Sequence, residues 1–246
     1  RVPTPEEQLD TDLGLFRDPR TERKVIDYFE YKQTAMEEPL EMMARTIKDA
    51  AAGAKLVCLF YGYTFDMHGI PRGPQNSGHL AMQRLINCPD VDSLCSPISY
   101  LDRQLGGAGC FMSAVDSVRT GGKLWLNEDD TRTYLTPEDA GYGRVGSPRQ
   151  TFWVHERNFG QLWPRRLACW YMDLGAAGWL NGKDIWDNIA AMQAFYRRHM
   201  DAPARWRPEV ALIIDESSPC YTKCTREHNR PLVYDMRSQY YRMGAP

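Results

Sequence analysis

The sequence lacks long apolar runs and any strong excess of one charge. Its longest apolar stretches, such as Leu56 to Tyr61 and Ala211 to Ile214, are far shorter than the roughly 20 residues that span a bilayer, so no membrane partner is expected. The 30 Lys and Arg residues nearly balance 32 Asp and Glu residues, and the net charge of −2 argues against a nucleic-acid partner. We therefore expect a ligand that is close to neutral or is recognised locally.

Motifs of several enzyme classes are also missing. There is no Gly-x4-Gly-Lys-Ser/Thr loop for phosphate and no Gly-x-Ser-x-Gly elbow for a serine nucleophile, and no cofactor is expected. The chain has 7 cysteines, an odd number that includes several in apolar runs, which slightly favours the reducing cytoplasm in a sequence with no visible signal peptide. Cys220-x3-Cys224-x3-His228 is only a weak zinc pattern without an identified fourth ligand, so no metal is expected.

Helical and strand-like segments alternate along the 246 residues. Apolar periodicity predicts helices over residues 21–52, 79–87, 114–119, 150–166 and 183–199, the first of them kinked or split at Pro39. Short apolar runs predict buried strands over residues 55–61, 91–96, 123–127, 167–173 and 209–214. The alternation predicts an α/β fold of parallel βαβ units, with functional loops at the carboxyl ends of the strands.

Acidic and aromatic side chains gather directly after these strands. Tyr63 and Asp66 follow the first strand, Tyr100 follows the second, and Trp179 lies beyond the fourth, which contains Trp170. Aromatic rings pack on the apolar face of a sugar, while carboxylates accept its hydroxyl groups and supply acid, base or nucleophile. The pattern therefore predicts a carbohydrate site.

The sharpest feature is the run of three acids from Glu128 to Asp130 directly after a buried strand. Mutual repulsion makes such a run costly unless the acids are paired or used. In the functional interpretation, Glu128 points into the site as a nucleophile and Arg132 with neighbouring hydrogen bonds keeps it ionised. In the alternative, the acids form a solvated turn, and spacing alone favours this second interpretation.

Several segments together resemble the carboxyl-terminal half of a clan A retaining glycoside hydrolase, most similar to bacterial proteins related to family 42 β-galactosidases. The resemblance covers about Val2 to Glu216. The segments that carry it are Phe60-Tyr-Gly-Tyr63, Ser77-Gly-His-Leu-Ala81, Pro89-Asp-Val-Asp92, Cys95-Ser-Pro97, Ser99-Tyr100, Gly122-Lys-Leu-Trp-Leu-Asn-Glu-Asp-Asp-Thr-Arg132, Arg157-Asn-Phe159, Trp170-Tyr-Met-Asp-Leu174 and Gly178-Trp179.

The resemblance implies a (β/α)8 TIM barrel, of which residues 1–203 form strands five to eight and their helices. Glu128 then matches the nucleophile at the end of strand seven, and the acid/base Glu would precede Arg1, so this half alone is expected to be inactive. Residues 204–246 resemble the start of the flavodoxin-like trimerisation domain, which implies a homotrimer of the full-length protein. The residues expected to bind substrate are Tyr63, Asp66, Tyr100, Trp125, Arg132, Trp170 and Trp179.

The function implied is β-galactosidase-like hydrolysis of terminal O-glycosidic bonds by a retaining double displacement. The sequence leaves open which sugar and linkage are used. A non-catalytic carbohydrate-binding or assembly protein on the same fold remains the alternative, because one of the two required carboxyls has no counterpart in this chain.

Overall fold

The computed structural model describes residues 1–67, 72–202, 208–224 and 236–243. Its centre is a sheet of four parallel strands in the order β1-β2-β3-β4, so neighbours in the chain are neighbours in space. The strands are β1 (Cys58–Phe60), β2 (Ser93–Pro97), β3 (Leu124–Asp129) and β4 (Ala168–Tyr171). The predicted α/β class and its first four strands are confirmed.

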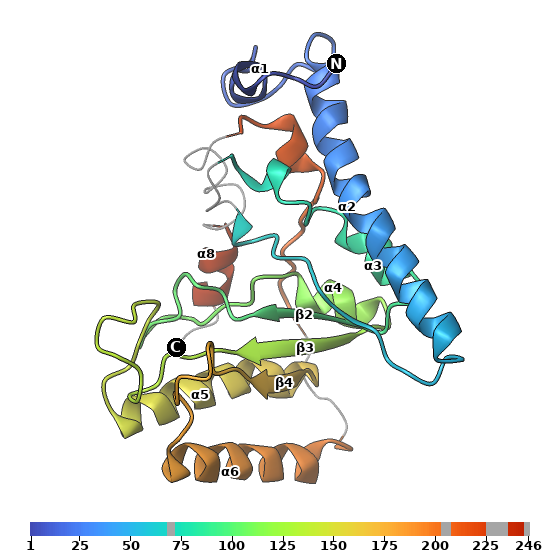
Figure 1. The fold of residues 1–246 in the computed structure, drawn as a ribbon. Coiled ribbons are helices and arrows are strands. Elements are labelled where there is room, and N and C mark those ends of the chain that lie inside the picture. The colour runs from blue at the N-terminus through green and yellow to red at the C-terminus, as the bar shows by residue number, and fades with distance from the viewer. Residues whose placement is uncertain (68–71, 203–207, 225–235, 244–246) are drawn as a thin grey trace.

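Helices precede the sheet, connect its strands and follow it (Figure 1). The segment 79–87 becomes helical only at Met82, and the long helix expected to run to Arg166 gives way to a 3₁₀ turn at Trp163. The helices are α1 (Pro5–Leu9), α2 (Arg23–Ala50), α3 (Met82–Asn87), α4 (Val115–Thr120), α5 (Pro148–Leu162), α6 (Lys183–His199) and α8 (Met236–Met243), with 3₁₀ turns η2 (Pro74–Asn76), η3 (Trp163–Arg165) and η4 (Ser218–Tyr221).

Helix α2 runs without interruption through Pro39, so the predicted split is wrong. Proline removes one backbone N–H donor from a helix interior. The helix nevertheless buries Ile26, Phe29, Glu37 and Ala44 completely, on both sides of the proline. The packing of α2 on both sides of Pro39 therefore outweighs the loss of one backbone hydrogen bond at the proline.

One face of the sheet is covered by helices. Leu94 and Trp125, on β2 and β3, pack in the main core with Leu85 of α3, Val118 of α4 and Leu162 of α5. Because paired residues of parallel strands point to the same side, this register assigns Leu59, Leu94 and Trp125 to the helix-covered face. The apolar runs seen in the sequence thus form a two-layer α/β core.

The opposite face of the sheet is partly exposed, at the outer strand β1 and at the start of β3. Phe60 of β1 is 52% exposed and Leu124 of β3 is 59% exposed. The rings of Phe60 and Trp170 meet at 6.4 Å although β1 and β4 are the two outer strands. Three strand spacings of a flat sheet measure roughly 14 Å. The sheet is therefore strongly curved, with this apolar face on its concave side.

Residues 209–214 form no strand, so the fifth predicted strand is wrong. The segment has an apolar run but no neighbouring strand, and Ile213 is 86% exposed. The chain then returns to the sheet unit: Glu216 accepts hydrogen bonds from the first amides of α3, and Arg237 of α8 is fully buried.

The predicted boundary at 203/204 lies outside the described residues, and the division into two domains stays a prediction. Among the described helices, none is long and apolar enough to cross a membrane.

Candidate functional site

Strand β3 places Glu128 on the concave face near its carboxyl end. Side chains alternate along a strand, so Glu128 shares this face with Leu124 and Leu126. The register sets Glu128 between Pro97 of β2 and Trp170 of β4. The acid thus lies at the rim of a curved apolar surface, where Glu128 as a whole is 7% exposed.

The surroundings of Glu128 raise its pKa to about 7, first because burial disfavours the charged form and second because Asp130 repels it. Arg103 and Arg132 act in the opposite direction but are the smaller influences. Among the described residues, no side chain donates a hydrogen bond to the Glu128 carboxyl group. Arg132 thus acts in the predicted direction, but it does not offset burial and Asp130, and the predicted side-chain hydrogen bonds to the carboxyl group are absent among the described residues.

Arg132 pairs with Asp130 instead. The Asp130 carboxylate lies 2.5 Å from Arg132 Nη1 and 2.7 Å from Arg103 Nη2. It also accepts a hydrogen bond of 3.1 Å from the Tyr100 hydroxyl group. These groups form a buried network, the Asp130 cluster, defined by Tyr100, Arg103, Asp130 and Arg132. Tyr100 and Arg132 are therefore held by Asp130, and neither contacts the Glu128 carboxyl group directly.

Aromatic rings enclose the Arg132 guanidinium group. Its central carbon lies 4.8 Å from the Trp179 ring centroid and 5.1 Å from that of Tyr142, and 5.6 Å from that of Tyr100. Such contacts between a cation and the faces of aromatic rings are attractive, more so where water is excluded. Trp179 is 8% exposed, so it serves chiefly to wall in the guanidinium group.

Tyr63 lies close enough to Glu128 that the carboxylate is one cause of its raised pKa, after burial. Its ring packs on His79 with centroids 4.7 Å apart. The amides of Gly62 and Tyr63 both donate to His79 Nδ1, at 3.1 and 3.4 Å. Burial lowers the pKa of His79 to about 4, so the imidazole is neutral and can accept these bonds. The loop after β1 is held in place by this contact.

Trp170 is the aromatic residue placed best for a ligand on the concave face. It is the register neighbour of Glu128 on β4 and is partly exposed. Its indole Nε1 is enclosed in the protein beside the Cys95 thiol, so the ring face, and not the N–H, is what Trp170 can offer to a ligand.

Two predicted binding residues do not belong to this site. Trp125 is 1% exposed and packs in the core under the helix-covered face, so its prediction as a substrate contact is wrong. Asp66 is occupied by the protein: it accepts hydrogen bonds from Ser99 Oγ and the Tyr100 amide, and Arg237 lies 3.1 Å from it. Its carboxylate joins the loops after β1 and β2 to α8 rather than facing a sugar.

Sequence reasoning missed Arg103 and Tyr142. Arg103 is 5% exposed, neutralises Asp130 and packs over the Tyr100 ring at 4.4 Å. The sequence did indicate that a cation is needed, because three consecutive acids after a buried strand require positive charges nearby. Nothing in the spacing identified which arginine would supply that charge, since Arg103 comes from the loop after the preceding strand.

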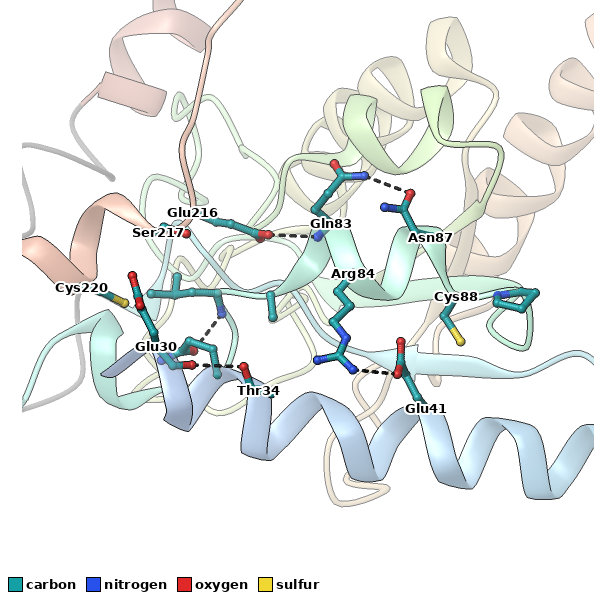
Figure 2. Close-up of a pocket in the computed structure, with 14 residues that line it drawn as sticks. Glu30, Thr34, Glu41, Gln83, Arg84, Asn87, Cys88, Glu216, Ser217 and Cys220 are labelled. Atoms are coloured by element: carbon teal, nitrogen blue, oxygen red, sulfur yellow. Dashed lines mark hydrogen bonds and ion pairs between the residues drawn. The ribbon is translucent and has the colours of Figure 1, made fainter. Parts of the chain in front are cut away.

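A separate cavity of about 580 Å³ lies between α2, α3 and the segment around Glu216 (Figure 2). Arg84 reaches the carboxylates of Glu37 and Glu41 at 2.9 and 3.2 Å. Glu216 accepts hydrogen bonds from the Met82 and Gln83 amides at 2.8 and 3.1 Å. The charged groups are thus engaged within the protein, and none of the predicted site residues lines the cavity. It is not part of the Glu128 site.

The described residues contain no group of three or more His, Cys, Asp and Glu side chains that could hold a metal ion. Cys220 and Cys224 of the weak zinc pattern are buried, and His228 lies outside the described residues. What the geometry provides is one carboxyl group of raised pKa, a buried cationic network and aromatic walls. That combination suits an uncharged polyhydroxy ligand.

The fold and site define a parallel α/β unit with an acidic, aromatic rim at the carboxyl ends of its strands. A comparison with protein-family models finds no match for the chain, and comparisons with curated proteins and with solved structures find none either.

Proposed function

We propose that this chain is part of a retaining glycoside hydrolase, β-galactosidase-like, in which Glu128 is the nucleophile. The observation that carries the proposal is the position of Glu128: concave face, carboxyl end of β3, register neighbour of a partly exposed tryptophan. In such a reaction Glu128 attacks the anomeric carbon while a second carboxylic acid protonates the leaving oxygen, and water then releases the glycosyl-enzyme.

The second carboxyl group would come from a further βα half of a (β/α)8 barrel that precedes Arg1 in the full-length protein. Two features support this. The concave face carries exposed Phe60 and Leu124, which closure of the barrel would bury. Strands β1 and β4 each have one neighbour among the described strands, so each leaves an edge that another strand can pair. In a retaining enzyme the two carboxyl groups lie roughly 5 to 5.5 Å apart.

The aromatic residues have distinct tasks in this proposal. Trp170 packs its ring against the apolar face of the sugar. Tyr63 borders the same space from the loop after β1. The Asp130 cluster does not bind the sugar directly; it fixes the charge that Glu128 experiences, because Asp130 raises the pKa of Glu128 while its two arginines lower it.

The test is an aryl-glycoside panel, galactoside first, on the full-length protein and its Glu128→Gln variant. We expect turnover of one glycoside to fall by about a thousand-fold or more on substitution, since a neutral amide cannot act as the nucleophile. Glu138→Gln, at an exposed position of the following loop, is the matched control and should keep its activity. Near wild-type turnover by the Glu128 variant would reject the assignment.

A non-catalytic carbohydrate-binding or assembly protein is the second candidate. It is favoured by the Asp130 cluster, in which the acid that most raises the pKa of Glu128 is already engaged in ion pairs, so Glu128 has no free carboxylate partner in the described site. Sugar binding by the full-length protein, without turnover of any glycoside, would support this candidate. Assembly of the full-length protein into trimers is proposed on the resemblance alone.

A further inference from the structure

An apolar groove runs along the outer surface between α5 and α6, which lie side by side (Figure 1). Its volume is about 680 Å³. Its residues recur at helical spacing on both helices, so each helix contributes one continuous stripe. The lining is Phe152, Glu156 and Phe159 of α5 with Asp184, Asp187, Asn188, Ala191, Met192 and Phe195 of α6.

The floor of the groove is aromatic and open to solvent. Phe152 is 41% exposed and Phe195 is 43% exposed. Phe159 meets Phe195 across the two helices with ring centroids 6.1 Å apart. Large aromatic side chains exposed together on neighbouring elements are a mark of interaction surfaces.

The rim of the groove is acidic. Its lining includes the carboxylates of Glu156, Asp184 and Asp187 and no lysine or arginine. The adjoining Lys183 pairs with Asp187 at 2.6 Å, but both side chains are largely exposed, and such pairs exchange readily for other partners. The groove therefore favours a cationic partner over an anionic one.

A buried amide group adds a polar feature to the floor. Asn188 is 6% exposed, and its Nδ2 has no acceptor among the described residues. A buried donor without an acceptor is costly, by roughly 1 to 3 kcal/mol. The Nδ2 atom is itself enclosed, so this amide borders the groove without offering a donor to it.

We propose that the groove between α5 and α6 docks a basic amphipathic helix of a partner protein. A helix fits because the ridges of a third helix can pack into the groove between two others. With α6 running from Lys183 to His199, about three to four turns of partner helix would span the groove. Its apolar residues meet Phe152, Phe159 and Phe195, and flanking lysines or arginines meet the carboxylates. A second copy of this chain fits poorly, because pairing two such grooves would bring like charges together.

The experiment measures binding of a fluorescein-labelled peptide of about 14 residues, composed of leucine and lysine with leucines along one helical face. We expect saturable binding to the full-length protein, weakened about ten-fold or more by the double substitution Glu156→Lys/Asp187→Lys. A peptide of identical composition with its leucines dispersed should bind at least about ten-fold more weakly, because it lacks an apolar face.

The matched control is Glu38→Lys/Asp49→Lys, which makes the same charge change at exposed positions of α2. It should alter the dissociation constant less than about two-fold, since these sites lie outside the groove. Equal weakening by both double variants, or equal binding of the dispersed peptide, would overturn the proposal. So would a dimer of the chain, detected by light scattering, that dissociates only in the groove variant, because the occupant would then be a second copy.

Discussion

Glu128 experiences opposing influences at the scale of the single residue. Burial and Asp130 raise its pKa, and Arg103 and Arg132 lower it, with the result at about 7. Because the pKa in the folded chain lies above the ordinary carboxyl value of 4.5, the protonated form is the one that folding favours. Stability from this group is present at acid pH and is lost as the pH rises toward 7.

Glu128→Gln should therefore change the pH dependence of stability. The variant carries a permanently neutral side chain, so relative to wild type it should gain up to about 3 kcal/mol in free energy of unfolding between pH 5 and pH 8. Urea denaturation at both pH values measures the difference, and Glu138→Gln should show no such gain. A constant difference between Glu128→Gln and wild type across that range would contradict the raised pKa.

Asp130→Asn should destabilise the chain by about 3 kcal/mol or more, because it leaves two buried guanidinium groups without their shared carboxylate. It should also lower the pKa of Glu128 by removing the stronger of the two repelling carboxylates. Denaturant titration checks the first effect, and ¹³C-detected titration of the Glu128 carboxyl group checks the second. The matched Asp139→Asn change, at an exposed loop position, should be nearly neutral in both measurements.

The position of an individual site residue was predictable only where the alternation of side chains along a strand determines which face it occupies. Side-chain alternation could have excluded Trp125, because a residue three positions before Glu128 on one strand must face the other side of the sheet. The role of Asp66 could not be foreseen, since its partner Arg237 lies 171 positions later in the chain. The contact depends on how the carboxyl-terminal helix packs, which no local pattern specifies.

At the scale of elements, the sequence predicted the strands and helices whose apolar side chains pack against a neighbouring element. Strands β1 to β4 and helices α5 and α6 each bury a recognisable face, and they lie where expected. Residues 209–214 have the composition of a strand but pair with none. A strand needs a neighbour for its backbone hydrogen bonds, and a composition pattern does not reveal whether one is present.

Asp66→Ala should loosen α8 from the sheet unit. Arg237 on α8 is fully buried and would lose the carboxylate 3.1 Å away, at a cost of roughly 3 kcal/mol. Hydrogen exchange of residues 236–243 should accelerate while that of α5 stays close to wild type. Unchanged protection of α8 would show that other contacts hold it and that Asp66 is not the tie described above.

At the scale of the whole molecule, the two faces of the sheet differ in how far their apolar side chains are buried. Leu94 lies in the covered core with no exposed surface, whereas Phe60 is 52% exposed on the concave face. Closure of a barrel would bury the second face as helices bury the first. The exposed apolar side chains on the concave face, Phe60 and Leu124, are therefore the structural support for the proposal that a further half of the barrel covers it.

Phe60→Ser should cost less than about 1 kcal/mol in this chain, while Leu94→Ser should cost about 3 kcal/mol or more because it places a small polar group in a filled core. In the full-length protein, Phe60→Ser should become strongly destabilising as well. Chemical denaturation of both variants in both forms measures this. A small cost for Phe60→Ser in the full-length protein would mean that nothing covers the concave face.

The most direct test of the central claim is covalent trapping of Glu128. The full-length protein would be incubated with a 2-deoxy-2-fluoro galactoside carrying an activated aryl leaving group, then digested and mapped by mass spectrometry. We expect a fluoroglycosyl ester on the peptide that contains Glu128, with no labelling in Glu128→Gln. Labelling of a different carboxylate by the same reagent would contradict it.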